Sequence, residues 1–320
     1  MPKRKSQSEW LLEKIKFLAD CGEKFQDSLT TIEYGPHTLL KLICVHYYAE
    51  MFAKIAKGQS AREQGYDGAV YLDLFAGPGV VTIKGSGDRI GGSPIAVTTA
   101  ALAKKAPFDY SIFVESNTDR SSALKQRLVS YLPSNAFVVI EGDCNSHIEN
   151  ILTYLRNRWQ KPIVLTFVDP EGMEAKWNTI KVLSKYLPNI DFMITLTSGV
   201  DRVAGRLASG MEGDRPIFED FFGTDADSVL VKSAQGEPVQ QQYQLGIKGV
   251  LGRPMGATIP IQDVHGRLTY QILGYTRLSW TGSPWARGFK TLQERLAGVN
   301  GGRARDTLNV AKGRQRQLSF

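Results

Sequence analysis

Cysteine and histidine are scarce in this 320-residue chain, and neither residue type forms a metal-binding pattern. The three cysteines, Cys21, Cys44 and Cys144, lie far apart, and no Cys-x-x-Cys pair occurs. This argues against a disulfide framework and against a zinc site, because both need grouped cysteines. The four histidines show no ligand spacing either. We therefore expect no bound metal.

Long apolar runs are also lacking. No stretch of about 18 apolar residues occurs, which argues against a membrane-spanning helix. The segment MPKRKSQSEW is basic but has no apolar core like that of a secretory signal. These absences predict a cytoplasmic protein with no membrane partner.

Excess charge is missing from most of the chain. The formal net charge is +7, of which residues 1–5 contribute +3 and residues 301–320 contribute +4. Residues 6–300 therefore have no net charge, and the excess lies in two terminal segments that we expect to be flexible. Such basic tails offer RNA or DNA a place to bind, whereas the body of the protein does not.

What the chain does contain is an alternation of short apolar segments with helical ones. This pattern predicts a parallel sheet with helices on both faces, followed by an antiparallel hairpin. The predicted strands are 70–76, 109–116, 137–143, 162–170, 191–198, 258–264 and 267–277. The arrangement resembles the Rossmann-like α/β fold of class I methyltransferases.

Domain boundaries follow from the same alternation. Apolar residues at helical spacing predict an N-terminal helical extension over residues 1–65. A methyltransferase-like domain is expected over 66–300, with an insertion at about 200–255 in which PIFEDFFG reads as a short helix. Residues 301–320 are expected to form the basic C-terminal tail.

The first candidate site is VYLDLFAGPG, residues 70–79, a buried strand that ends in a glycine turn. Ligands of open α/β sheets bind at the carboxyl ends of strands, and glycine lets a ligand approach the backbone closely. No helix begins directly after the turn, so the pattern is not a dinucleotide fingerprint and favours S-adenosylmethionine. The alternative is a tight turn packed on a helix. The predicted cofactor contacts here are Asp73, Phe75, Ala76, Gly77 and Gly79.

Acidic residues end the next two strands. Glu115 could accept hydrogen bonds from both hydroxyls of a ribose, and its alternative role is a solvated loop acid. Asp143 could accept from an adenine amine beside the small wall of Cys144, or it could simply cap the following helix. Both acids are predicted to bind the cofactor.

The fourth strand ends in Asp169-Pro170-Glu171-Gly172. In amino-directed methyltransferases such an Asp side chain and the prolyl carbonyl accept hydrogen bonds from the target nitrogen, so Asp169 and Pro170 are the predicted catalytic pair. Catalysis of this kind consists mainly of positioning. The alternative is an ordinary Asp-Pro turn.

With these motifs, the chain resembles the three-Cys-motif partner family, methyltransferase-like proteins encoded mostly in bacteria beside a protein with a three-cysteine motif. The resemblance rests on YLDLFAGPG, GGSPIAV, FVDPEG and IDFMITL and covers about residues 36–290. It implies S-adenosylmethionine as cofactor, a protein partner, and a substrate region at Glu171, Trp177 and Arg202. In base-directed relatives a proline and an aromatic residue stand where this chain has Glu171 and Gly172; Trp177 or Phe218 could stack on a base instead.

The sequence thus favours a methyltransferase that works with a partner and acts on nucleic acid. Its main alternative is a methyltransferase fold without catalysis, serving as a partner-binding or nucleic-acid-binding subunit. A nicotinamide-dependent oxidoreductase is a third alternative, but it would need a complete phosphate-binding loop.

Overall fold

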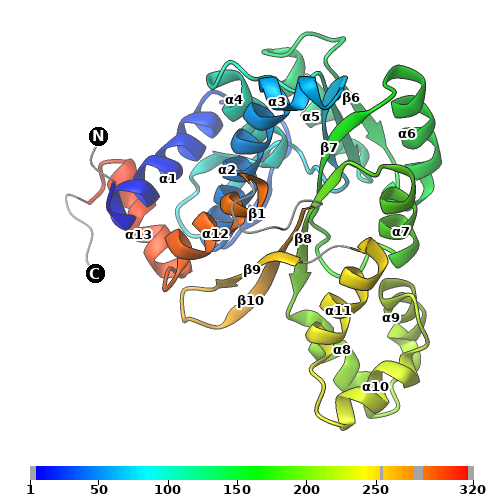
Figure 1. The fold of residues 1–320 in the computed structure, drawn as a ribbon. Coiled ribbons are helices and arrows are strands. Elements are labelled where there is room, and N and C mark those ends of the chain that lie inside the picture. Colours follow the sequence, from blue (N-terminus) through cyan, green and yellow to red (C-terminus); the bar gives the residue numbers. More distant parts are fainter. Residues whose placement is uncertain (1–4, 253–254, 277–283, 316–320) are drawn as a thin grey trace.

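The central feature of the computed structural model is a seven-stranded sheet (Figure 1). The structure describes residues 5–252, 255–276 and 284–315. The strand order is β6-β5-β2-β7-β8-β10-β9, and β10 runs in the opposite direction to the other six strands. The predicted fold class, a Rossmann-like methyltransferase fold, is therefore confirmed. The strands are β2 (Gly68–Asp73), β5 (Tyr110–Glu115), β6 (Phe137–Glu141), β7 (Pro162–Val168), β8 (Ile190–Thr197), β9 (Met255–Gln262) and β10 (Leu268–Tyr275).

Helices cover both faces of this sheet, as the buried strands require (Figure 1). Along β2 the side chains alternate, so that Tyr71 packs into one core and Val70 and Leu72 into the other. The first core lies under α1 (Gln7–Glu23), α2 (Thr38–Ala56), α4 (Ser93–Ala103), α5 (Thr118–Val129), α12 (Pro284–Leu296) and α13 (Gly301–Ala311). The second lies under α6 (Cys144–Arg158) and α7 (Trp177–Tyr186).

Residues 80–92, between the glycine turn and α4, are part of a small second sheet. β3 (Val80–Ile83) and β4 (Arg89–Gly91) form a hairpin, and β1 (Ile32–Tyr34) pairs in parallel with β3. Gly85 and Gly87, both with positive φ, let the chain reverse between β3 and β4. Because β1 comes from far earlier in the chain, no local pattern indicates this sheet.

The C-terminal segment also differs from expectation. Residues predicted as a flexible tail form α13, which lies beside α1 (Figure 1) and buries Ala304 and Leu308. Arg314 donates to Asp88 at 2.8 Å, and Lys312 pairs with Glu23. The expectation that residues 301–311 are flexible is wrong. The prediction was based on the charged residues of this segment and overlooked the apolar residues at helical spacing between them.

The insertion forms a helical lobe at one end of the sheet (Figure 1). The predicted PIFEDFFG helix is present as α9 (Arg215–Phe222). The other elements of the lobe are α8 (Gly199–Ala208), η1 (Glu212–Asp214), α10 (Ala226–Ala234) and α11 (Val239–Leu251), and a short α3 (Gln59–Glu63) follows α2 elsewhere. Among the described residues we find no helix whose length and hydropathy would let it span a bilayer.

Candidate active site

A cavity of about 460 Å³ opens at the carboxyl ends of the parallel strands. Its position is the topological switch point, because the chain runs from β2 to β5 and β6 on one side and continues to β7 and β8 on the other. The volume lies within the range of roughly 300–1,000 Å³ that is usual for small-molecule sites. The structure brings nine predicted site residues together around it: Phe75, Ala76, Gly77, Gly79, Glu115, Asp143, Cys144, Asp169 and Glu171.

Two glycines of the turn after β2 are favoured by positive φ, and one of them also by packing. Gly77 has φ +63°, and a Cβ built there meets only Ile32 Cδ1 at 3.6 Å, so backbone conformation is what favours glycine. Gly79 has φ +81°, and a Cβ there would lie 2.9 Å from Leu124 Cδ1. Helix packing therefore adds to the backbone conformation in favouring glycine at Gly79, and both glycines line the cavity.

Glu115 connects this turn to the end of β5. Its Oε2 accepts a hydrogen bond from Gly77 N at 2.9 Å, and its Oε1 accepts from Asn117 N at 2.8 Å. Each carboxylate oxygen can accept a second hydrogen bond. The side chain is almost fully buried and lines the cavity, so a ligand with paired hydroxyls could occupy these remaining positions.

At the end of β6, Asp143 both caps a helix and lines the cavity. Its Oδ1 accepts from Asn145 N at 3.0 Å, which is the capping role considered from sequence. Because the carboxylate has further acceptor sites, the cap does not prevent a ligand contact. Burial raises the pKa of Cys144 to about 12, so its thiol is neutral and serves as a small wall rather than a nucleophile.

Asp73 lies behind the turn rather than in the cavity. It is fully buried, Tyr71 Oη donates to its Oδ2 at 3.0 Å, and Phe75 N donates to its Oδ1 at 3.3 Å. Burial raises the pKa of this carboxyl to about 7. The predicted direct cofactor contact is therefore corrected: Asp73 braces the turn that faces the cavity.

The Asp169 carboxylate forms an ion pair with Lys41 of α2, with 2.6 Å between Oδ2 and Nζ. Both side chains are mostly buried, with 12% of Lys41 and 14% of Asp169 exposed. Lys41 Nζ also lies 5.4 Å from the ring centroid of Tyr34 and 5.2 Å from that of Tyr270. Sequence analysis missed Lys41, because nothing local distinguishes it from other helical lysines.

Glu171 lies at the rim of the cavity. Tyr34 Oη donates to its Oε1 at 2.8 Å, and Arg120 Nη1 lies 3.8 Å from the same oxygen. Burial and the neighbouring Glu171 raise the pKa of Tyr34 above its ordinary value, so the phenol stays protonated. Pro170 is buried and does not line the cavity, although its neighbours on both sides do.

Two predicted substrate residues lie elsewhere. Trp177 begins α7 and packs against Tyr243 of the insertion, with ring centroids 5.9 Å apart. Arg202 lies exposed on α8, which belongs to the insertion. Phe218 is fully buried in the insertion's core, so it cannot stack on a substrate. None of the three lines the cavity. Helices α9 and α11 of the insertion pack against α7 instead.

Acidic side chains outnumber basic ones in the lining. The acids are Glu115, Asp143, Asp169, Glu171 and Glu174, and the bases are Lys41, Arg120 and Lys176. A net negative lining favours a ligand with positive or no charge over a phosphate. Within the described parts of the chain, no group of three or more His, Cys, Asp or Glu side chains is placed to hold a metal ion.

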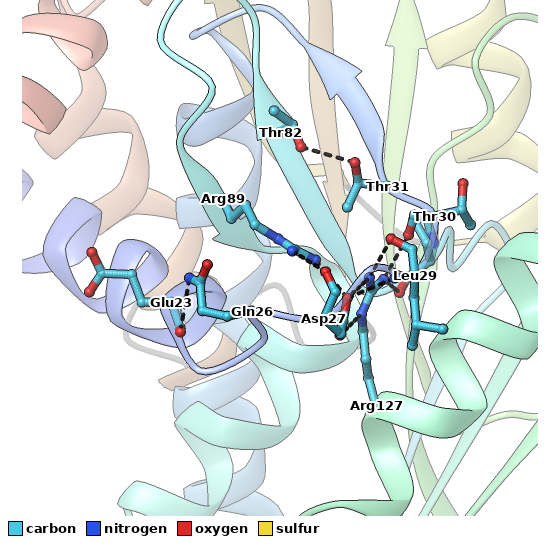
Figure 2. A network of polar contacts seen from close by, with 10 residues as sticks. Glu23, Gln26, Asp27, Leu29, Thr30, Thr31, Thr82, Arg89 and Arg127 are labelled. Atoms are coloured by element: carbon cyan, nitrogen blue, oxygen red, sulfur yellow. Dashed lines mark hydrogen bonds and ion pairs between the residues drawn. The ribbon is translucent and has the colours of Figure 1, made fainter.

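The wall formed by β1 is held by a buried arginine (Figure 2). Arg127 of α5 is 1% exposed and donates to both oxygens of Asp27, at 3.0 and 2.8 Å. It also donates to the carbonyls of Leu29, Thr30 and Pro78. One guanidinium thus joins the segment leading into β1 to the glycine turn.

Comparisons with known proteins add little to this geometry. No protein-family model and no curated protein match the chain. Protein LPL1258 from Legionella pneumophila is 13% identical over 79% of this chain and 91% of its own, with a TM-score of 0.46. Trm1 from Pyrococcus horikoshii, solved with S-adenosyl-L-methionine, is 11% identical over 90% of this chain and 78% of its own, with a TM-score of 0.38.

A third similar structure comes from Staphylococcus aureus and is assigned as a caffeoyl-CoA O-methyltransferase. It is 13% identical over 84% of this chain and 98% of its own, with a TM-score of 0.38. Because all three TM-scores lie below 0.5, the fold assignment rests on the strand order of the sheet itself. The resemblance to the three-Cys-motif partner family stays a prediction.

Proposed function

We propose that this protein is an S-adenosylmethionine-dependent methyltransferase. The observation that carries the proposal is one cavity at the switch point, lined by a glycine turn and by acids at the ends of two successive strands. Glu115 offers acceptor sites for ribose hydroxyls, and Asp143 offers them for an adenine amine. The negative lining also suits a cofactor with a sulfonium centre.

When bound, S-adenosylmethionine supplies an activated methyl group, so the chain itself has little bond chemistry to perform. Asp169, fixed by Lys41, can accept a hydrogen bond from the attacking group and orient its lone pair. The partly closed cavity limits access of water, which strengthens these polar contacts. Positioning and exclusion of water are therefore the two contributions that we assign to the protein.

Calorimetric titration with S-adenosylmethionine and S-adenosylhomocysteine tests the cofactor assignment. Glu115→Gln should weaken binding about tenfold, since losing a charged hydrogen bond costs roughly 1.4 kcal/mol. Glu141→Gln is the matched control, because Glu141 is the register partner of Glu115 but bonds Thr118 and Ser121 outside the cavity. Absence of heat with both ligands would contradict the proposal.

The second candidate is a methyltransferase fold that binds a partner or nucleic acid without catalysis. Glu171 and Gly172 favour it, because they replace the proline and aromatic residue of base-directed enzymes. Incubation with labelled S-adenosylmethionine and host RNA, DNA and protein separates the two. Label that reaches an acceptor, and is lost in Asp169→Ala, supports catalysis; cofactor binding without any transfer supports the second candidate.

We also propose a protein partner, on the basis of the family resemblance. Met211, Ile217, Val231 and Leu245 of the insertion are each more than half exposed, which gives such a partner apolar contacts. Nucleic-acid binding through the C-terminal basic residues has less support, because Lys312 and Arg314 pair with acids of the same chain. Reproducible copurification that is lost on replacing these four apolar residues by serine would test the partner.

A further inference from the structure

We propose that Tyr34 and Lys41 complete an acceptor site at the 169–171 turn, and that this site takes a planar heteroaromatic amine. This inference rests on the proposed function, since it concerns the acceptor of the same cavity. Both residues come from the N-terminal extension, and both line the cavity together with Asp169 and Glu171. The sequence motifs point to a target nitrogen at Asp169 and Pro170, but they give no role to Tyr34 or Lys41.

Tyr34 provides the aromatic ring that the turn lacks. In base-directed methyltransferases an aromatic residue follows the Asp-Pro turn, whereas this chain has Glu171 and Gly172 there. Tyr34 Oη donates to Glu171 Oε1 at 2.8 Å, so a ring from β1 is tied to the turn at the residue before the position of that aromatic. Lys41 Nζ lies 5.4 Å from the ring centroid, which further fixes the ring beside the cavity.

Lys41 and Asp169 together offer a hydrogen-bond donor beside an acceptor. Their charged atoms are 2.6 Å apart, and only one of the three ammonium hydrogens is needed for that contact. An amino group next to a ring nitrogen presents the complementary pair, an N–H donor beside a lone-pair acceptor. Side chains with an adjacent donor and acceptor recognise base edges in this way.

The charges of Lys41 and Asp169 disfavour charged acceptors. A carboxylate or phenolate acceptor would be repelled by Asp169, and an ammonium group has no lone pair for attack and would be repelled by Lys41. The ion pair has no net charge, which favours a neutral amine. In the transfer, the lone pair of that nitrogen forms the new bond to the methyl carbon, the C–S electron pair returns to sulfur, and the nitrogen passes its proton to the Asp169 carboxylate.

The test uses the full chain saturated with S-adenosylhomocysteine and ligand-observed NMR titration of two probes. 1-Methylcytosine has the amine and ring nitrogen, and 1-methyluracil has an oxygen in place of the amine. We expect 1-methylcytosine to bind at least fivefold more tightly. Lys41→Met and Tyr34→Leu should each weaken its binding at least fivefold, and Lys41→Met should also remove the preference over 1-methyluracil, which a purely structural role would leave unchanged.

Lys104→Met is the matched control, because Lys104 pairs with Glu50 at 3.4 Å and does not line the cavity. Cofactor binding is measured first. If it is intact, three outcomes would overturn the inference: equal affinity for the two probes, no binding of either probe, or an unchanged preference in Lys41→Met. If the wild-type chain does not bind the cofactor, the proposed function is overturned as well. Comparing the affinity for a deoxycytidine trinucleotide with that for 1-methylcytosine shows whether the site prefers an amine within a nucleic-acid strand or an amine on a free base.

Discussion

At the scale of single residues, Asp73 is a carboxyl group whose buried environment disfavours the ionised form. It is completely buried below the glycine turn and is held by Tyr71 and by the backbone of Phe75. Burial raises its pKa from 3.8 to about 7, so the folded protein keeps this proton at pH values where the unfolded chain has lost it. The group therefore links folding to pH.

The sign of that link gives the first residue-scale prediction. Between about pH 4 and pH 7 the folded state binds more protons than the unfolded state, so Asp73 makes the free energy of unfolding fall as pH rises. Asp73→Asn should flatten this dependence, since the amide does not titrate. Urea unfolding at several pH values measures it, and equal slopes for variant and wild type would show that Asp73 titrates normally.

Gly79 permits a second residue-scale prediction. Gly79→Ala should lower the free energy of unfolding by about 2–4 kcal/mol, because positive φ adds strain and the new Cβ lies 2.9 Å from Leu124 Cδ1. Gly85→Ala is the control, because Gly85 has φ +87° but a Cβ there meets nothing within 4 Å. Denaturant unfolding of both variants should give the larger loss for Gly79→Ala; equal losses would mean that helix packing contributes nothing.

At the scale of elements, the cavity depends on a strand that local sequence does not reveal. β1 has only three residues, and its partner β3 lies about fifty positions further on. Arg127 joins the segment before β1 to the glycine turn (Figure 2), so one side chain positions both the wall and the floor of the cavity. Sequence analysis could not detect this, because an arginine on an amphipathic helix reads as solvated.

Arg127→Lys should therefore weaken S-adenosylhomocysteine binding about tenfold, since lysine cannot reproduce the planar set of donors to Asp27 and three carbonyls. Hydrogen exchange over residues 27–34 should rise in parallel, which calorimetry alone would not reveal. Arg156→Lys, at an exposed position of α6, is the control. Unchanged hydrogen exchange and affinity in Arg127→Lys would mean that the hydrogen bonds of Arg127 do not hold β1 in place.

At the scale of the whole molecule, the two terminal segments form part of the same core. α1 and α13 pack side by side (Figure 1), and Leu308 of α13 is 1% exposed in the first core. Leu308→Ala should lower the free energy of unfolding by about 2–4 kcal/mol through the cavity that it leaves. Val310→Ala, at a partly exposed position, should cost less than 1.5 kcal/mol by the same reasoning. Thermal unfolding compares the two variants. Equal effects would mean that α13 does not contribute to the core.

The sequence by itself determined the strands of the sheet and the acids at the strand ends, because strand periodicity and turn chemistry are local properties. Phe75, Gly77, Glu115 and Asp169 lie where that reasoning placed them, at one edge of one sheet. Only the tertiary structure decided that Asp73 lies behind the turn, that Trp177 packs against the insertion, and that Tyr34 and Lys41 meet the 169–171 turn. These are contacts between residues far apart in the chain, and no local pattern encodes which distant side chain will fill a given place.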